Sequence, residues 1–251
     1  MLSRVRLCSR GVLIPLAHAL LPSSCALCGA RCDAPVCAPC HAQFFGQARL
    51  RCRQCANPIE AEGGRLCAHC LTNPPPFEAS VAATDYAAPV DQLVLQLKFG
   101  ARLALAPWFS RMLRDAVLEQ PDFVLPSLLC PVPLGPRRLA ERGFNQALEI
   151  AKPLASALGI GLFPRLATRI HDTRAQSALR PGQREPNIAH AFTVTPGALA
   201  LVRGQHIGIV DDVMTSGQTL GELAATFKRF GAARVSNLVF ARTPPRQSFL
   251  D

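Results

Sequence analysis

The sequence predicts an α/β protein: a mostly parallel sheet with helices on both faces, preceded by a small cysteine-rich module. Three observations support this prediction. Apolar runs with strand and helix periodicity alternate from residue 77 onwards, as in parallel sheets. Four Cys-x-x-Cys pairs crowd the first 70 residues. The apolar run from Ile207 to Val210 has the character of a central strand, and two adjacent acids follow it directly.

The chain opens with three arginines and an apolar run from Gly11 to Leu21. The run faintly resembles a secretory signal peptide, but Pro15 and His18 interrupt it. We therefore predict a short N-terminal helix within residues 1–22. No stretch of the sequence is long and apolar enough to span a membrane, and the many cysteines need a reducing compartment. These features predict a cytoplasmic protein.

Residues 23–76 hold too few large apolar side chains for a stable core of that size. Two residues between thiols let one turn present both sulfur atoms to a tetrahedral ion, so two pairs close a structural Zn²⁺ site. The alternatives are disulfides, which need an oxidising compartment, and redox-active pairs, which need a βαβ context. Sequential pairing is the simplest assignment, although crossed pairing stays open. The two predicted sites are Cys25, Cys28, Cys37 and Cys40, and Cys52, Cys55, Cys67 and Cys70.

A proline-rich linker, Asn73 to Pro76, marks a predicted domain boundary, so that residues 23–76 form a double zinc ribbon and residues 77–251 the α/β domain. The expected strands cover residues 79–86, 128–132, 162–170, 207–210 and 235–241. The expected helices cover residues 90–99, 103–118, 147–158 and 220–230.

A small, hydroxyl-rich loop separates the 207–210 strand from the helix that follows, which ends before Gly231. Residues 215–219 therefore lie at a helix N-terminus, where unpaired amide groups and the helix dipole favour a phosphate. Asp211 and Asp212 can accept hydrogen bonds from sugar hydroxyls. The alternative is an ordinary helix with Thr215 or Ser216 as its N-cap, but capping does not call for two adjacent acids.

This pattern resembles the phosphoribosyl pyrophosphate (PRPP) signature of type I phosphoribosyltransferases. The resemblance implies that the two acids are catalytic and that the loop binds PRPP together with Mg²⁺. The implied PRPP-binding residues are Val210, Asp211, Asp212, Val213, Met214, Thr215, Ser216, Gly217, Gln218 and Thr219.

A second loop follows the 128–132 strand and leads into a run of arginines. In PRPP-binding folds a loop at this place receives the pyrophosphate, and cations can fork onto phosphate oxygens. The alternative is a proline-stiffened loop with a solvated arginine run, and a lone lysine at a helix end equally suits the helix dipole. The candidates are Lys98, Pro131, Val132, Pro133, Leu134, Arg137 and Arg142.

Several further motifs follow in the order seen in the ComF/GntX family. They are Leu97–Gly100, Pro131–Leu134, Arg142–Ala147, Thr173-x-x-Gln176-x-x-Leu179, Arg184-x-x-Asn187 and Val210–Asp212. The resemblance implies a phosphoribosyltransferase-type domain fused to a zinc module, in proteins linked to natural transformation. The length of the polar stretch 171–190 and its Pro181-Gly182 pair suggest a loop over the site, which is either a mobile lid or an ordinary exposed connection. The lid candidates are Asn145, Gln146, Gln176, Arg184 and Asn187.

The net charge of +10 fits either a basic site for a polyanionic small molecule or a nucleic-acid binder. The first hypothesis is a PRPP-binding phosphoribosyltransferase acting in DNA uptake, or in purine or pyrimidine salvage. The second is a non-catalytic uptake factor that binds single-stranded DNA and the uptake machinery. A third is a PRPP or nucleotide sensor. One Trp and one Tyr offer few stacking platforms, which counts against strong single-strand binding, and the acceptor base cannot be deduced.

Overall fold

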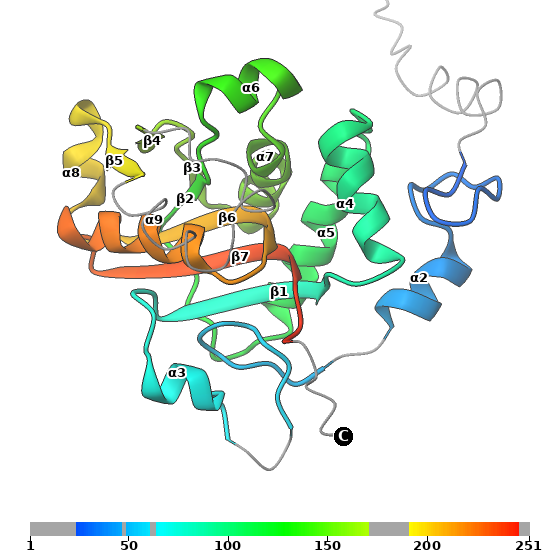
Figure 1. Ribbon diagram of the computed structural model, residues 1–251, viewed down its shortest axis with the longest axis horizontal. Coiled ribbons are helices and arrows are strands. Elements are labelled where there is room, and N and C mark those ends of the chain that lie inside the picture. The colour runs from blue at the N-terminus through cyan, green and yellow to red at the C-terminus, as the bar shows by residue number, and fades with distance from the viewer. Residues whose placement is uncertain (1–23, 47–48, 61–63, 171–190, 246–251) are drawn as a thin grey trace, which may run out of the picture. The chain divides into compact units, whose positions relative to one another are not determined.

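The computed structural model describes residues 24–46, 49–60, 64–170 and 191–245 (Figure 1). The chain forms two compact units, residues 1–47 and 48–251. The first contains helix α2 (Ala38–Phe45) and the first group of four cysteines. The second contains the sheet and the second group. The compact units therefore separate between residues 47 and 48, whereas the sequence predicts a boundary after Pro76.

The larger unit is built on a five-stranded sheet in the order β1-β7-β6-β2-β3, and every neighbouring pair is parallel. The predicted parallel sheet is confirmed. Its strands are β1 (Ala79–Asp85), β2 (Leu128–Pro131), β3 (Gly161–Leu162), β6 (His206–Met214) and β7 (Arg234–Arg242).

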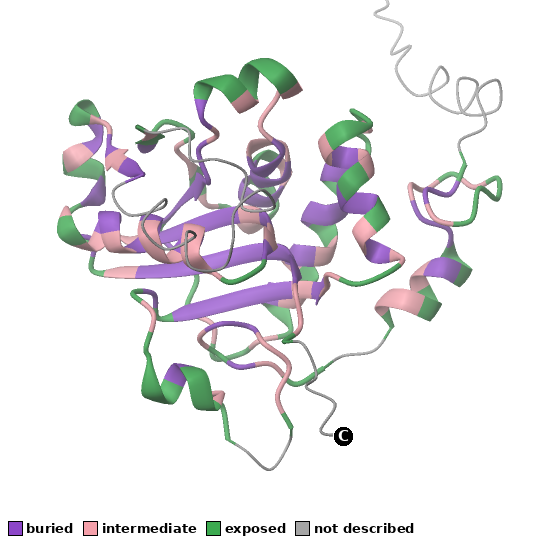
Figure 2. Ribbon diagram, in the orientation of Figure 1, coloured by how far each residue is buried: buried purple, intermediate pink, exposed green. Residues whose placement is uncertain are grey.

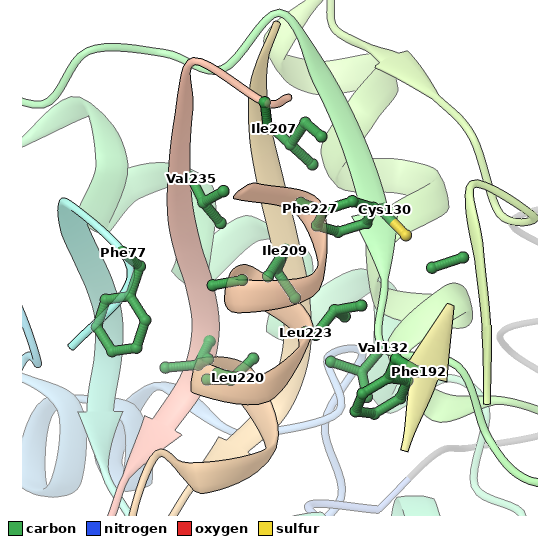
Figure 3. Packing of buried hydrophobic residues seen from close by; sticks show 14 of the residues in the cluster. Phe77, Cys130, Val132, Phe192, Ile207, Ile209, Leu220, Leu223, Phe227 and Val235 are labelled. Atoms are coloured by element: carbon green, nitrogen blue, oxygen red, sulfur yellow. The ribbon is translucent and has the colours of Figure 1, made fainter. Parts of the chain in front are cut away.

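Helices cover both faces of the sheet, as the sequence predicts (Figure 1). Successive side chains of β7 point to opposite faces. Phe240 stacks on Phe109 of helix α5, with ring centroids 3.6 Å apart, whereas Val239 joins the core cluster of Leu223 and Phe227 from helix α9. Figure 3 shows that cluster packed between α9 and the strands, and Figure 2 shows how completely β6 and β7 are buried. The helices of this unit are α3 (Ala68–Thr72), α4 (Val90–Phe99), α5 (Leu105–Leu118), α6 (Pro136–Arg142), α7 (Gln146–Leu158), α8 (Leu199–Val202) and α9 (Gln218–Arg229), with a 3₁₀ turn at Pro196–Ala198.

Strand β6 is longer than predicted. The apolar run stops at Val210, but pairing continues through both acids to Met214, opposite Arg242 of β7. Backbone pairing with β7 holds this extension although its side chains are no longer all apolar. The acids therefore lie inside the last part of the strand rather than after it.

Other boundaries differ from the prediction as well. The expected strand over 162–170 is two short strands in different sheets, β3 and β4 (Ala167–Arg169), because β4 turns away to pair antiparallel with β5 (Phe192–Val194). The arginine run after Pro136 is helical, where the sequence predicts a loop, since Pro is well suited to a first helical turn. Among the described residues, no helix is long and apolar enough to cross a membrane.

The second cysteine segment packs directly on the edge strand of the sheet. The amide of Ser80 in β1 donates to the carbonyl of Arg53 at 2.9 Å, and the Ser80 hydroxyl donates to the carbonyl of Gln54 at 2.6 Å. Asn237 of β7 donates to the same hydroxyl at 3.0 Å. The segment thus covers part of an edge that would otherwise expose unpaired backbone groups.

We expect Gly208→Ala to destabilise the larger unit by about 1–3 kcal/mol, because it overpacks the middle of β6. A Cβ atom at this position would lie 2.6 Å from both Leu129 Cδ2 and Pro126 Cγ. Urea denaturation measures the change. The matched control is Gly197→Ala, where the added methyl meets nothing within 4 Å. Equal stability of the two variants would contradict the close packing described for β6.

Candidate functional site

The loop after β6 leads straight into the N-terminus of α9. Gly217 is the N-cap residue and has a positive φ of 83°, a conformation that favours glycine. Thr215 and Ser216 are exposed, and the Ser216 hydroxyl accepts from the amide of Gln218 at 3.4 Å. Because the N-cap residue has no side chain, the first turn of this twelve-residue helix presents amide groups and hydroxyls together. Such an arrangement suits an anion.

The two acids next to this loop have different surroundings. Asp212 is buried and forms an ion pair with Lys98 at the end of α4, with 2.6 Å between Nζ and Oδ2. Asp211 accepts a hydrogen bond from the amide of Asp212 at 2.9 Å. The predicted candidates Lys98, Asp211 and Asp212 are thus brought together, although Lys98 was expected at the pyrophosphate rather than on an acid.

The electrostatics of these three groups are coupled. Burial opposes the charge of Lys98, but the attraction of Asp212 outweighs it and raises the lysine pKa. Burial, and secondly the charge of Asp212, raise the pKa of Asp211 well above the usual range of a carboxyl. Asp212 is therefore paired with a cation, while the surroundings of Asp211 favour its protonated form.

Arg142 adds a second positive charge beside the acids. It ends α6, its guanidinium lies 5.3 Å from the ring centroid of Phe99, and it donates to the amide oxygen of Gln146. Burial lowers its pKa, and both acids counter that effect. Phe99 itself is 74% exposed, so an aromatic face lies at the edge of the site.

The predicted pyrophosphate loop follows β2, which is the neighbour of β6. The amide of Val132 donates to the carbonyl of Val210 at 2.9 Å, and the side chain of Asn145 donates to the carbonyl of Val132 at 3.0 Å. Because β2 and β6 are parallel and adjacent, their two loops leave the same edge of the sheet. Ligands of open α/β sheets bind at this edge.

Some predicted residues have other places. Arg137 pairs with Glu141 along α6, and its side chain is 79% exposed. The sequence predicts Asn145 and Gln146 as part of a lid, but the two residues begin α7. Asn145 caps the helix by accepting from the amides of Ala147 and Leu148, and Gln146 is buried. A capped helix start is a fixed element, so these two residues support the loop after β2. Gln176, Arg184 and Asn187 lie outside the described residues.

Arg242 is not among the residues predicted from the sequence, yet it contacts the end of β6 and the loop that follows. It is 5% exposed and donates to the carbonyl of Met214 at 3.0 Å and to the carbonyl of Thr215. The one feature of the sequence that could have indicated this role is an arginine at the end of an apolar strand.

The eight predicted zinc ligands form two groups of four, paired sequentially as in the simplest assignment. The sulfur atoms of each group lie within 4.8 Å of one another, with 3.7 Å between Cys28 and Cys37 and 3.6 Å between Cys55 and Cys67. Tetrahedral Zn²⁺ with bonds of about 2.3 Å places its sulfur ligands about 3.8 Å apart. The geometry fits zinc, and these cysteines form no disulfides.

Backbone amides support one thiolate in each group. Burial raises the pKa of Cys25, but hydrogen bonds from the amides of Cys28, Cys37 and Leu27 outweigh it and lower the pKa to about 6. Burial likewise raises the pKa of Cys52, but hydrogen bonds from the amides of Cys55, Cys67 and Gln54 outweigh it and lower the pKa to about 7. Thiolates are the form that binds zinc.

Comparisons with known proteins agree with this architecture. The chain matches the family described as phosphoribosyl transferase domain over residues 145–250 and the double zinc ribbon domain over residues 16–71. It is 36% identical to DNA utilization protein YhgH of Salmonella typhimurium over 211 residues, which cover 83% of this chain and 90% of the relative. It is 27% identical to competence protein F of Haemophilus influenzae over 198 residues, which cover 76% and 84%. The chain belongs to the ComF family.

Membership of the ComF family accounts for both parts of the structure. The YhgH protein of Escherichia coli K12 is also 36% identical, over 195 residues that cover 76% of this chain and 84% of that protein. The matched phosphoribosyl transferase region contains the acids and the loop after β6. The matched zinc ribbon contains all eight cysteines, so structural zinc is the role of the two groups.

We expect Lys98→Met to lower the free energy of unfolding by about 1–3 kcal/mol, because it leaves the buried Asp212 carboxylate without its cation. Urea denaturation at neutral pH checks this. Adding Asp212→Asn should restore part of the loss, since the amide is neutral.

The matched control for this variant is Lys152→Met. It removes a lysine whose side chain is 53% exposed and pairs with Glu149, and surface pairs contribute at most about 1 kcal/mol. If Lys98→Met were no more destabilising than this control, the Lys98 pair would not be a buried counter-ion.

Proposed function

We propose that the site at the ends of β6 and β2 binds PRPP, or a closely related phosphosugar, together with Mg²⁺. One observation carries the proposal: two carboxylates, an exposed hydroxyl-rich loop and a helix N-terminus follow one another directly from Asp211 to Gln218. A sugar phosphate needs hydrogen-bond acceptors for its hydroxyls and donors for its phosphate at this separation. This segment supplies both.

Each part of the ligand has a partner in the proposal. The 5'-phosphate lies on the amides and hydroxyls of residues 215–219. The ribose hydroxyls donate to Asp211 and Asp212. The pyrophosphate lies between the loop after β2 and the cations Lys98 and Arg142. Mg²⁺ supplies positive charge that neutralises the pyrophosphate oxygens.

Phosphoribosyl transfer is the reaction that such a site supports. The bond between C1 of ribose and the pyrophosphate oxygen breaks, and the pyrophosphate leaves with its electron pair. An acceptor nitrogen forms the new bond to C1 and releases its proton to water. Asp211 and Asp212 hold the sugar, and the nearby cations favour the departing charge. In this proposal the chain works in the cytoplasm.

The names of the relatives suggest where the site is used. Because those proteins are called DNA utilization protein and competence protein F, we place the phosphosugar site of this chain in the handling of incoming DNA or of the bases released from it. Salvage of purines or pyrimidines is the matching chemistry, since a free base is the acceptor that PRPP would modify.

A second candidate function is binding of single-stranded DNA without catalysis. The exposed ring of Phe99, beside Arg142, favours it, because bases stack on aromatic rings and guanidinium groups. The two acids count against it as the principal function, since they repel a phosphate backbone.

Titration of the zinc-loaded protein with Mg²⁺-PRPP tests the principal proposal. We expect binding in the wild type, and at least about a tenfold loss in Asp212→Asn, because the amide is a weaker acceptor and disturbs the ion pair. Asp115→Asn is the matched control, since Asp115 pairs with Arg114 on the solvent-facing side of α5. Absence of PRPP binding in the wild type would refute the proposal.

The same titration with single-stranded DNA separates the two candidates. Phe99→Ala should weaken DNA binding and leave PRPP affinity within about twofold, while Asp212→Asn should do the reverse. Equal losses of both ligands in both variants would contradict two separable sites.

The affinity for Mg²⁺-PRPP should increase with pH as Asp211 ionises, because its raised pKa leaves more of it protonated than an ordinary carboxyl. Calorimetry across the acid and neutral range measures this, and Asp211→Asn should flatten that part of the profile. Stability has the opposite sign: the contribution of protonated Asp211 is fully present below its unfolded-state pKa of about 3.9 and is lost as pH rises through the folded-state pKa. Identical profiles in wild type and variant would contradict this role of Asp211.

A further inference from the structure

Arg242 contacts both the second cysteine group and the loop that enters α9, of which residues 215–219 are the proposed phosphate loop. Its Nε donates to the carbonyl of Cys55 at 2.9 Å. Its Nη1 donates to the carbonyls of Met214 at 3.0 Å and Thr243 at 2.8 Å, and also to that of Thr215. One buried side chain thus joins a zinc-ligand residue to the loop that enters α9.

Two contacts of Arg242 help to orient the amides of the loop: one to the carbonyl of Thr215, and one to the carbonyl of Met214, which also accepts from the amide of Thr243 at 3.0 Å. Neither residue is in a cis peptide bond, so the carbonyl of each points away from the N–H of the residue that follows. When Arg242 holds the two carbonyls on the inner side, the N–H groups of Thr215 and Ser216 are directed to the other side. Thr215 and Ser216 are exposed, so we infer that these amides are accessible to the phosphate of the proposed ligand.

At the other end, the position of the Cys55 carbonyl depends on the fold of its cysteine segment. Residues 52–57 form a tight turn, in which the amide of Ala56 donates to the carbonyl of Cys52 at 2.8 Å and that of Cys52 to the carbonyl of Asn57 at 2.7 Å. Cys52 and Cys55 hold this turn through the metal-binding group they share with Cys67 and Cys70. A small segment of this kind depends on its metal for a fixed conformation.

We propose that Arg242 is a positioning residue through which zinc in the second cysteine group orders the phosphate loop. The inference deepens the proposed function, since it rests on phosphate binding by residues 215–219. The carbonyls of Cys55, Met214, Thr215 and Thr243 provide hydrogen-bond acceptors for the buried guanidinium. Without the Cys55 carbonyl, Arg242 would lose one fixed partner and the loop would lose its rigid support.

The first cysteine group is an internal control. It has the same ligand chemistry, but its thiolate Cys25 accepts from the amides of Leu27 and Cys37, inside the other compact unit. Loss of zinc from this group should leave the phosphate loop unchanged.

The experiment compares Cys67→Ser, in the second group, with Cys28→Ser, in the first. Zinc content, hydrogen exchange of amides 213–219 and the affinity for Mg²⁺-PRPP are measured for each. Each variant should lose one zinc ion. Only Cys67→Ser should speed exchange in the loop and weaken PRPP, by about tenfold or more. Unchanged loop exchange in a Cys67→Ser protein that has lost its second-group zinc would overturn the proposal.

If Cys67→Ser does not fold, two further variants test the same proposal, Arg242→Met and Arg242→Lys. Both should retain two zinc ions and the slow exchange of the β6 core, yet show faster exchange in residues 213–219. Lysine should recover only part of the loss, because its single ammonium cannot reach every carbonyl that the guanidinium fork reaches. Faster exchange throughout the sheet would reveal a purely structural role and overturn the proposal.

These readouts separate two kinds of failure. If the wild type does not bind Mg²⁺-PRPP, the proposed function fails, while the exchange data still decide whether Arg242 orders the loop. If the wild type binds PRPP and the second-group and Arg242 variants bind it equally well, the proposed function stands and the coupling fails.

Discussion

The parallel pairing of β6 with β2 on one side and β7 on the other is the constraint on which the rest of the structure depends. It brings the loops after β2 and β6 to the same edge of the sheet, and it places Arg242, at the end of β7, opposite Met214. The close packing around Gly208 shows how little freedom the strand has. Because the strand is fixed, short loops at its end can hold a ligand with defined geometry.

Charge compensation is the second requirement at this edge. Two adjacent carboxylates near the end of a mostly buried strand repel each other, and their surroundings differ: Lys98 forms an ion pair with Asp212, while the pKa of Asp211 rises. A ligand rich in hydroxyl donors and accompanied by Mg²⁺ would relieve both groups.

The two cysteine groups share their chemistry but not their surroundings. Four thiolates stabilise a small segment where apolar burial is insufficient. The second group is also part of the main hydrophobic core, which includes Cys52, Cys55 and Cys70, and its backbone bonds to β1 and Arg242. Within the larger unit, Arg242 therefore links a cysteine of this group to the end of β6.

The sequence by itself determined the parallel α/β class, both groups of zinc ligands and the acids with their loop, because strand and helix periodicity and the Cys-x-x-Cys spacing are local patterns. It placed the end of β6 too early, since an apolar run marks burial rather than backbone pairing. Only the tertiary structure decided that Lys98 pairs with Asp212, that Asn145 and Gln146 begin a helix, and that Arg242 donates to the carbonyl of Met214. Those contacts join residues distant in sequence, and no spacing rule encodes which distant strands and helices will meet.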